Sequence, residues 1–584
     1  MYFIEYFRKA LDRMLRPMIL DCLKGYDRKQ LFADLTAGLI VGILTIPLSI
    51  AFAIASGVSP EKGIVTAFIG GFVLSLLGGS RVQICGPTGA FVIILFGIVQ
   101  QYGVDGLATA TLMAGLILAI MGFSGLGSVI KFIPYPVTVG FTSGIAVIIF
   151  TSQISDLLGL SIKDMPADFI GKWAEYAKVV SGVNLHAAAL GGFTLLILIF
   201  WPKISRRVPG ALMAIILSAA AAKIFGLNVE TIGSRFGNIT STLPTPVMPN
   251  LDYSVIRGLI SPAVSIALLG AIEALLSATV ADGMIGGKHR SNMELVAQGA
   301  ANILSPLFGG IPATGAIART AANIRNGGRT PIAGITHAVV ALLIMICLGQ
   351  WVKLIPLAAL AAVLVMVSYN MSEWRTFIGL LKNQRSDVAV LVITFALTVL
   401  ADLTEAIQVG VVLSAILFMR RLTMVSGVEV ISREISDGDQ NSLISEDDAK
   451  ELKRVPPGTD VYEINGPFFF GTAFKFEEGI ESVSAVGKQL KARILRMRNV
   501  PVIDSTGLNA LRQFLSQCNR HKITLILSGV QPAVLRAIRK TGLDEQIGHE
   551  NITNNFKSAV ARAKIVHGWL AKPQDDRAVE DGYE

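Results

Sequence analysis

The segment Ile311–Arg319 constrains the fold most strongly, because a proline, a glycine and a charged arginine interrupt a long apolar region there. Irregular backbone at membrane depth is tolerated only where it is buried in protein or lines a cavity. A helix starting near Thr314 would direct unpaired backbone N–H groups and a positive dipole end at whatever lies before it. The segment therefore predicts an anion site, with a proline kink between two ordinary spans as the alternative.

The Thr-Gly-Ala core at Thr314 has a second copy at Thr88, 226 positions earlier. The other pairs at this offset are Pro47 and Glu273, Ala55 and Ala281, Gly57 and Gly283, and Lys62 and Lys288. Chance matching of Gly and Ala is the alternative, but one offset serves both motif pairs. Matching interrupted segments in the two halves of a chain are a sequence pointer to a transporter binding site.

Apolar runs with short breaks fill residues 31–422, and only 16% of the chain is charged, against about a quarter in soluble proteins. A span needs about 20 apolar residues. We predict an all-α membrane domain of fourteen spans, near 31–55, 63–79, 83–100, 106–123, 131–157, 185–201, 208–225, 255–283, 291–308, 312–327, 331–349, 354–371, 387–402 and 404–422. The third and tenth are predicted half-helices. Because seven spans separate the copies, the repeat is inverted, seven plus seven.

Basic loops predict the orientation of these spans. Residues 1–30 are basic and indicate an amphipathic helix on the cytoplasmic membrane surface, or else a solvated tail. The basic loops that fall on the same side with fourteen spans are Lys203/Arg206/Arg207, Lys288/His289/Arg290, Arg325/Arg329, Lys382/Arg385 and Arg420/Arg421. The outward loops near Asp105 and Asp402 lack Lys and Arg. Both termini are therefore predicted to be cytoplasmic, and the net charge of +9 indicates these loops rather than nucleic-acid binding.

The composition changes after the last span. Residues 423–459 are polar and acidic and are predicted to be a linker. In 460–570, predicted strands at 461–464, 492–497 and 523–527 alternate with predicted helices at 474–486, 508–518 and 533–541, which indicates a small α/β domain. The polar tail 571–584 is predicted to be disordered.

Glu273 is the outstanding ionisable residue, because it lies in the middle of an apolar span. Such a carboxylate is a functional-site hypothesis, and removal from water favours its protonated form, so it is able to exchange protons. A structural carboxylate bonded to backbone or hydroxyl groups is the alternative. Ser277 lies one turn on, on the same face.

Three further residues are candidates for lining the same cavity. Arg319 would add positive potential to the anion site, or else pair with a carboxylate or extend to the cytoplasmic surface. Ser49 and Phe52, just past Pro47, would line the cavity or serve packing alone.

The chain lacks several motifs that other functions require. It has neither a Gly-rich Lys loop nor a Gly-x-Gly-x-x-Gly turn in a strand–helix context, so transport would use an ion gradient, exchange or passive flow rather than bound ATP. The four cysteines have no metal-ligand spacing. We expect no enzyme activity, metal or cofactor. Asp504, Ser505 and Thr506 lie between a predicted strand and helix, where Ser or Thr would cap the helix or a phosphate would fit.

These residues resemble the SulP (sulfate permease) family of anion transporters with a C-terminal STAS domain. The segments that carry the likeness are Asp34–Gly57, Gly86–Gly89, Gly270–Lys288, Asn292–Gln298, Gly309–Arg319 and Asp504–Leu508. The resemblance implies a core domain that moves against a gate domain in the bacterial inner membrane, usually as a dimer. It places substrate between half-helices 3 and 10, facing spans 1 and 8. The implied substrate residues are Ser49, Phe52, Thr88, Gly89, Ala90, Glu273, Ser277, Gly315, Ala316, Ile317 and Arg319. The STAS turn at Asp504, Ser505 and Thr506 is a partner and phosphorylation surface in that wider family.

Within the family, the chain looks similar to the bacterial branch that carries four-carbon dicarboxylates by proton symport. Five segments carry this likeness: Arg28–Val58, Gly79–Arg81, Phe141–Gly144, Asn370–Glu373 and Phe418–Arg421. That branch has an alanine where this chain has Gly315, which leaves substrate size open. The sodium–bicarbonate branch has Asp, Thr and a hydroxyl residue where this chain has Glu273, Ser277 and Ile317, and this difference weakens a sodium site.

Alternatives remain at this stage. Sulfate, bicarbonate or chloride would use the same machinery. A nucleobase transporter of the same fold would need a second Glu on span 10, which is absent here, and would lack a STAS domain. A membrane-anchored STAS signalling protein is disfavoured by the half-helix pair and Glu273.

Overall fold

The computed structural model describes residues 15–128, 134–162, 165–166, 168–205, 209–237, 245–249, 253–401, 427–430, 450–469 and 490–570, with short pieces between 406 and 419 and residue 476. The chain divides into two units, Met1–Ser414 and Ala415–Glu584, and each is described by itself.

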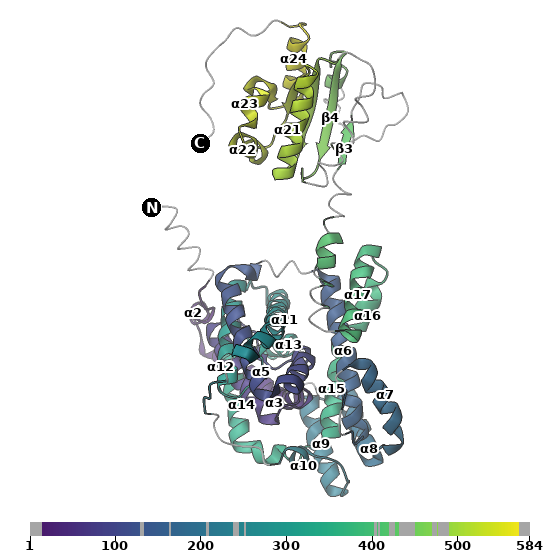
Figure 1. The fold of residues 1–584 in the computed structure, drawn as a ribbon. Coiled ribbons are helices and arrows are strands. Elements are labelled where there is room, and N and C mark those ends of the chain that lie inside the picture. Colours follow the sequence, from purple (N-terminus) through teal and green to yellow (C-terminus); the bar gives the residue numbers. More distant parts are fainter. Residues whose placement is uncertain are drawn as a thin grey trace. The chain divides into compact units, whose positions relative to one another are not determined.

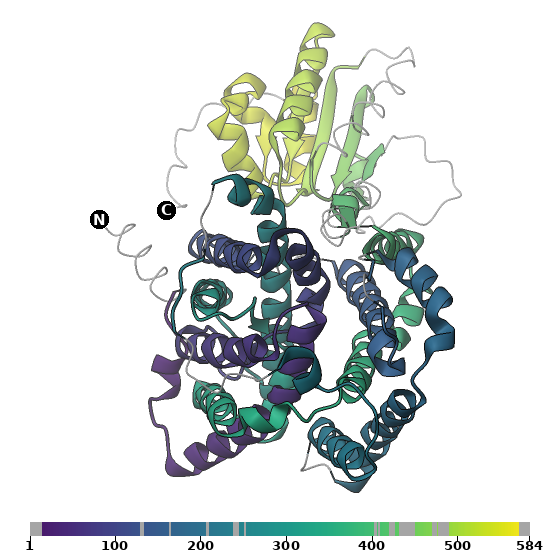
Figure 2. The same ribbon diagram turned by 60° about the horizontal axis from the view of Figure 1, so that its bottom comes forward.

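The first unit contains two helical bundles (Figure 1). The first bundle is built from α3 (Arg28–Ala55), α4 (Pro60–Leu77), α5 (Val92–Phe123), α11 (Tyr253–Ile285), α12 (Ser291–Leu307), α13 (Ile317–Arg325) and α14 (Pro331–Val352). The second is built from α6 (Tyr135–Leu158), α7 (Phe169–Val179), α8 (Leu185–Ile204), α9 (Gly210–Ile224), α15 (Leu357–Met371), α16 (Trp374–Leu380) and α17 (Arg385–Leu400). Figure 2 shows the bundles side by side. Each takes helices from both halves of the sequence, which is the arrangement that two interlocking repeats produce.

Eight helices of the described chain are long and apolar enough to cross a membrane. They are Arg28–Ala55, Pro60–Leu77, Gly89–Phe123, Tyr135–Leu158, Leu185–Ile204, Val255–Ile285, Pro331–Val352 and Leu357–Leu380. The second half of predicted span 3 and all of predicted span 4 fall within α5, which is two helices that meet at a kink at Gly103, where φ is 71° and ψ is −173°. About half of the predicted span 404–422 lies outside the described residues. The count of fourteen stays a prediction.

Two of the predicted spans are interrupted, as their Pro and Gly content indicated. The first contains strand β1 (Cys85–Gly86) followed by the 3-10 turn η1 (Gly89–Phe91), which leads into α5. The second contains strand β2 (Thr314–Gly315) followed by α13, a helix of only 9 residues. Neither segment begins as a continuous spanning helix, so each exposes backbone groups inside the bundle.

Small residues bring the helices of the first bundle close together. A Cβ built on Gly115 of α5 would meet the backbone of Gly299 on α12, and a Cβ on Gly299 would meet Gly115 in return. Such close approach of backbones is how helices pack in a membrane, where burial of apolar surface adds little driving force. The two glycines therefore hold α12, from the second repeat, against α5, from the first.

Asp34 joins the beginnings of α3 and α14. Its buried carboxylate accepts hydrogen bonds from the backbone N–H of Arg329 at 2.8 Å and of Thr330 at 3.3 Å, and from the Thr330 hydroxyl at 2.6 Å. Tyr26 donates a further bond from its phenol at 2.9 Å. One carboxylate thus satisfies orphan donors at the start of α14 and ties them to α3.

The described part of segment 1–30 is not one continuous helix. The short helix α2 (Ile19–Cys22) ends before α3 starts at Arg28, and residues 1–14 lie outside the described part. Asp21 accepts from the guanidinium of Arg290, at the start of α12, and Arg16 pairs with the same carboxylate at 3.1 Å. These pairs hold the pKa of Asp21 below its usual value. The hydrogen bond from Arg290 is the largest cause. The N-terminal segment is therefore docked on the first bundle.

The second unit contains a five-stranded sheet in the order β3-β4-β5-β6-β7. Its strands are β3 (Gly427–Val430), β4 (Thr459–Asn465), β5 (Ala492–Asn499), β6 (Thr524–Ser528) and β7 (Ile552–Thr553). Only the β3–β4 pair is antiparallel. One buried cluster includes Phe514 of α21 (Ser505–Arg520) and Ile538 of α22 (Pro532–Lys540), and another includes Phe556 of α24 (Phe556–Val566). Helix α23 (Leu543–Ile547) completes the unit.

The predicted α/β pattern is confirmed for three strands and two helices of this unit. The predicted helix at 474–486 lies almost entirely outside the described residues. One boundary needs correction, because β3 falls within the segment 423–459 that we interpreted as linker. Val428 and Val430 alternate with Glu429, a strand signal that is short and adjoins the polar, acidic residues that follow, and pairing with β4 defines the strand.

Candidate functional site

The two interrupted segments meet inside the first bundle. Strands β1 and β2 pair in antiparallel fashion, with Cys85 opposite Gly315 and Gly86 opposite Thr314. A further backbone bond runs from the N–H of Ala316 to the carbonyl of Ile84 at 2.9 Å. The two Thr-Gly-Ala copies, far apart in sequence, thus lie beside each other.

Each strand is followed by a helical start that has no side-chain cap. Thr88 precedes η1 with φ −127° and ψ 158°, and Ala316 precedes α13 with φ −99° and ψ 114°, and both are extended. Neither residue accepts a bond from its own helix through its side chain. Such helix starts offer N–H donors and positive potential, which is the chemistry of an anion site.

Glu273 is linked directly to the first of these helical starts. The hydroxyl of Thr88 donates to Oε2 of Glu273 at 2.8 Å, and both side chains are half-buried. The nearby guanidinium of Arg319 attracts the carboxylate electrostatically. An ionisable group from α11 is therefore in contact with the turn that precedes η1.

The face of α11 that carries Glu273 lies along the strand pair. Thr314 donates its hydroxyl to the carbonyl of Gly270 at 3.0 Å, and Gln83 donates its amide to the carbonyl of Ala274 at 3.1 Å. One turn on, the Ser277 hydroxyl bonds to that of Thr320 on α13 at 3.3 Å. The predicted pairing of Glu273 and Ser277 on one face is confirmed by these contacts.

Arg319 reaches across to the first repeat. It is 2% exposed, and its Nη2 donates to the carbonyl of Pro87. Its Nη1 has no hydrogen-bond partner in the described part of the chain. Extension to the cytoplasmic surface does not apply because Arg319 is buried, and its attraction to Glu273 acts through space, without an ion pair among the described residues, since its bond is to a backbone carbonyl. Nη1 of the buried Arg319 guanidinium is thus able to donate a hydrogen bond to a bound ligand.

Gly89 lies where the two bundles meet. A Cβ built on it would lie 3.2 Å from Cε1 of Phe52 on α3, 3.1 Å from Cδ1 of Ile149 on α6 and 3.1 Å from Sδ of Met371 on α15. Phe52 and Gly89 are therefore together, as predicted, and side chains of the second bundle cover this point.

The other predicted substrate residues have less direct contact with Glu273 and Thr88. Ala90 is fully buried and follows Gly89. Ser49 is fully buried, and its hydroxyl has no hydrogen-bond partner among the described residues. Ile317 begins α13 with 43% of its surface exposed, and no described polar contact joins it to Glu273 or Thr88.

Gly315 has a packing role that the sequence did not reveal. A Cβ built there would coincide with the amide nitrogen of Gln83. The absence of a side chain at 315 therefore accommodates Gln83, which in turn bonds to α11. The place of Gly315 in the substrate site, and its bearing on substrate size, stay predictions.

Sequence reasoning missed several buried polar residues around the strand pair. Glu294, fully buried on α12, accepts from the N–H groups of Gly79 at 2.7 Å and Ser80 at 2.8 Å. The amides of Gln298 and Asn302 donate to the carbonyl of Ala313. Polar residues four apart on an apolar helix were the available signal for this last pair. Glu294 gave none, because it follows a basic loop.

The Asp504 turn in the second unit is a helix cap. The carboxylate of Asp504 accepts from the N–H of Gly507 at 2.8 Å at the start of α21. We expected Ser or Thr to cap this helix, and that assignment is wrong, because the aspartate lies one residue earlier, at the N-cap. Ser505 and Thr506 are exposed.

Comparisons with known proteins decide the family. A model described as the sulfate permease family matches residues 31–394, and a STAS domain model matches residues 452–561. The chain belongs to the sulfate permease family. It is therefore a multi-pass membrane transporter of anions with a C-terminal STAS domain, and not an enzyme.

Two relatives illustrate the range of names in the family. A Bacillus subtilis (strain 168) protein named putative sulfate transporter YvdB is 41% identical over 90% of this chain and 97% of its own length. A Picosynechococcus protein named bicarbonate transporter BicA is 30% identical over 92% of this chain and 95% of its own.

Solved structures of other transporters have the same fold. The murine Solute Carrier 26 family member A9 anion transporter superposes with a TM-score of 0.84, at 19% identity, over 95% of each chain. The transmembrane domain of a cyanobacterial bicarbonate transporter BicA gives a TM-score of 0.59 at 30% identity, over 67% of this chain and 98% of that one.

Proposed function

We propose that this sulfate permease family member is a proton-coupled symporter of a small dianion such as succinate or fumarate. The observation that carries the proposal is the hydrogen bond from Thr88 to Glu273. It connects a carboxylate that can take up a proton to the helical start whose N–H groups suit an anion.

The coupling follows from electrostatics. An ionised Glu273 would repel an anion held at Thr88, since two like charges a few ångströms apart in a poorly hydrated site repel strongly. Protonation removes that repulsion and turns the carboxylate into a hydrogen-bond donor. Anion and proton would therefore bind together and be released together.

The substrate would lie between the helical starts that follow β1 and β2. Arg319, with its free Nη1, would add positive charge, and Ser277, Ala316 and the covering Phe52 would complete the site. Two facing helical starts and a guanidinium favour a dianion over a monoanion. The segments similar to the dicarboxylate branch favour a four-carbon dicarboxylate.

Sulfate or bicarbonate is the second candidate, and the names of the relatives favour it. Proton coupling is supported over sodium coupling by Ile317, whose apolar side chain offers no oxygen to a cation that needs several oxygen ligands.

Alternating access would proceed by an elevator-type movement of the first bundle against the second. The contacts of Gly89 with Ile149 and Met371 would then have to separate during each cycle. We also propose cytoplasmic termini, a bacterial inner-membrane location, a homodimer, and a STAS domain that regulates, with a partner or phosphate at the Asp504–Thr506 turn.

Uptake by the purified full-length protein in proteoliposomes tests the proposal. Labelled succinate, sulfate and bicarbonate are supplied separately, with and without an inward proton gradient. Glu273→Gln should accumulate none of them against a gradient, because its amide cannot take up a proton. Exchange of labelled for unlabelled anion should persist in this variant.

Glu294→Gln is the matched control, because Glu294 is a buried carboxylate on the neighbouring helix α12 that bonds only to backbone N–H groups of the described chain. An amide oxygen at this position still accepts from Gly79. Normal pH-dependent accumulation by Glu273→Gln would reject proton coupling through Glu273. Gradient-independent uptake by the unmodified protein would reject symport.

A further inference from the structure

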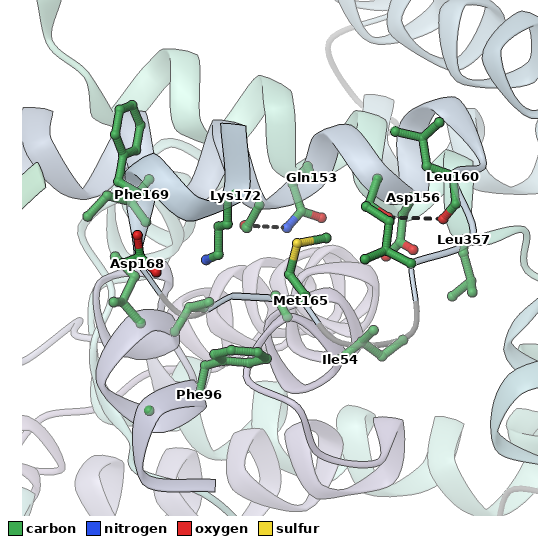
Figure 3. Close-up of a pocket in the computed structure, with 18 of the residues that line it drawn as sticks. Ile54, Phe96, Gln153, Asp156, Leu160, Met165, Asp168, Phe169, Lys172 and Leu357 are labelled. Carbon is green, nitrogen blue, oxygen red and sulfur yellow. Dashed lines mark hydrogen bonds between the residues drawn. The ribbon is translucent and has the colours of Figure 1, made fainter. Parts of the chain in front are cut away.

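A cavity of about 1450 Å³ lies between the two bundles, on the side of the membrane that the predicted topology places outside. The ends of α3 and α5 line it from the first bundle, and α6 and α7 line it from the second (Figure 3). The cavity extends along α5 as far as Val92, directly after η1. None of the substrate residues predicted from sequence lines it.

Most charged groups in the cavity wall are paired. Arg235 of α10 (Ile232–Phe236) bonds to Asp156 at 2.9 Å and to Glu230 at 2.6 Å. Asp168 accepts from the N–H of Gly171 at 2.7 Å and so caps α7. These contacts engage three carboxylates and one guanidinium.

Lys172 is the exception. Only 6% of it is exposed, and no described carboxylate lies within 4.0 Å of its Nζ. The ring of Phe96 lies beside the ammonium, with its centroid 5.6 Å from Nζ, and the carboxylate of Asp168 acts on it only through space. Figure 3 shows the side chain directed from α7 into the cavity, toward Phe96. Burial lowers the pKa of Lys172, and the charge of Asp168 only partly offsets this.

An ammonium that is largely removed from water and has no carboxylate at ion-pair distance is incompletely compensated, and a ring face offsets a small part of that cost. Structural lysines at such burial are normally paired. An ammonium facing a large cavity without a partner indicates a place for a mobile anion.

We propose that this cavity is a vestibule that binds the transported anion through Lys172 before it reaches the half-helices. The ligand is a carboxylate or sulfate group that accepts a charge-assisted hydrogen bond from Nζ. The nearby amide of Gln153, bonded to the hydroxyl of Ser152 at 2.9 Å, supplies a second polar surface. The volume leaves room for water, so the anion enters partly hydrated.

The vestibule is separate from the site at Glu273. Ile54, Ile148 and Val92, nearby in the sequence, line the cavity, whereas Phe52, Ile149 and Met371 lie against Gly89 and do not line it. An anion at Lys172 would therefore wait until these three side chains separate. The identity of the anion rests on the proposed function, whereas the presence of an anion at Lys172 does not.

Lysine labelling of the full-length protein tests binding at this place directly. An anionic amine reagent, trinitrobenzenesulfonate, is reacted with the protein in nanodiscs, and modification of individual lysines is followed by mass spectrometry. Succinate or sulfate should slow labelling of Lys172 about tenfold. Lys178 on the same helix is the internal control, because its side chain is 69% exposed and pairs with Glu175. Its labelling should not change.

The same measurement on Glu273→Gln separates this inference from the proposed function. Protection of Lys172 in both proteins supports the vestibule whether or not proton coupling is correct. Protection that is absent from both proteins, or that Lys178 shares, overturns it. Protection that disappears in Glu273→Gln also overturns it, because it would then report a conformational change driven from the other site.

Uptake kinetics provide a second test. Lys172→Met should raise the KM for the external anion about tenfold with little change in kcat, because it removes an encounter site and leaves the half-helices intact. Lys172→Arg should restore the KM, and Lys178→Met should match the unmodified protein. A fall in kcat at constant KM, or equal effects of both methionine variants, would show that Lys172 has only a structural role.

Discussion

At the residue scale, Gly315 determines how β2 packs before α13. It has no side chain, and this leaves room for Gln83. Gln83 occupies the volume where a Cβ would lie, and from there it holds a carbonyl of α11. A glycine in a binding motif is commonly interpreted as leaving space for a ligand. At position 315 that space is occupied by the side chain of Gln83.

Gly315→Ala should therefore lower stability by about 1 to 3 kcal/mol, the range for an overpacked core. In a Gln83→Ala background the same substitution should cost little, because the clash is gone and only the loss of the Gln83 bond to Ala274 remains. Thermal unfolding of the purified variants measures both effects. Gly192→Ala, at a helical position with nothing within 4 Å of the added Cβ, is the control and should not destabilise. If Gly315→Ala destabilises the Gln83→Ala variant as much as it destabilises the unmodified protein, Gln83 is not the obstacle.

Two carboxylates of the first bundle, on the neighbouring helices α11 and α12, differ in burial and in the partners that hold them. Glu273 accepts from a hydroxyl and is half-buried, whereas Glu294 is fully buried and accepts from two backbone N–H groups. A group held by fixed backbone donors stabilises a loop. A group with one side-chain partner and partial access is the one to which our proposal assigns the proton.

At the scale of elements, the start of α14 depends on the carboxylate of Asp34, which belongs to the other repeat. Asp27, only seven residues earlier, caps α3 by accepting from the N–H of Gln30 at 2.7 Å, and that bond is exposed. The chain thus contains two aspartates at helix starts that differ in burial and in whether they join distant segments.

Asp34→Ala should cost about 3 kcal/mol or more, because several buried donors lose their acceptor. Asp27→Ala should cost about 1 kcal/mol, as for an ordinary exposed cap. Unfolding temperatures of the two variants, measured in the same detergent, compare these losses. Equal losses, or a larger loss in Asp27→Ala, would contradict the view that Asp34 fastens α14 to α3.

The sequence was sufficient for elements whose signals are local. Pro and Gly at membrane depth predicted the interruptions at Thr88 and Thr314, and alternating residues predicted β4, β5 and β6. It was not sufficient for polar residues whose partners are distant. Gln83 bonds to Ala274, and Asp34 bonds to Thr330. The sequence around Gln83 or Asp34 does not indicate which distant residue is the partner. The burial of Lys172 depends in the same way on helices from both halves.

At the scale of the whole molecule, the transport unit and the STAS unit have separate cores. β3 begins at Gly427 and belongs to the sheet of the second unit. A cut after Ser426 therefore removes that sheet as a whole and leaves no unpaired strand on the membrane domain.

The truncated protein 1–426 should fold and keep the order of preference among succinate, sulfate and bicarbonate, with a changed rate or assembly state. Binding assays on full-length and truncated protein, with size-exclusion chromatography for assembly, measure this. A change in which anion binds would show that the STAS domain takes part in the permeation path, and our division of labour would be wrong.

The pairing of β1 with β2 also has a consequence for biosynthesis. Gly86 is paired only when Thr314 has been made, roughly 230 residues later, which at about 5–20 residues per second is an interval of roughly 10 to 50 s. During that interval the first half-helix lies in or beside the bilayer with open backbone groups, which lipid cannot satisfy. The nascent chain therefore needs water, the insertion machinery or a chaperone at this point until its second half arrives.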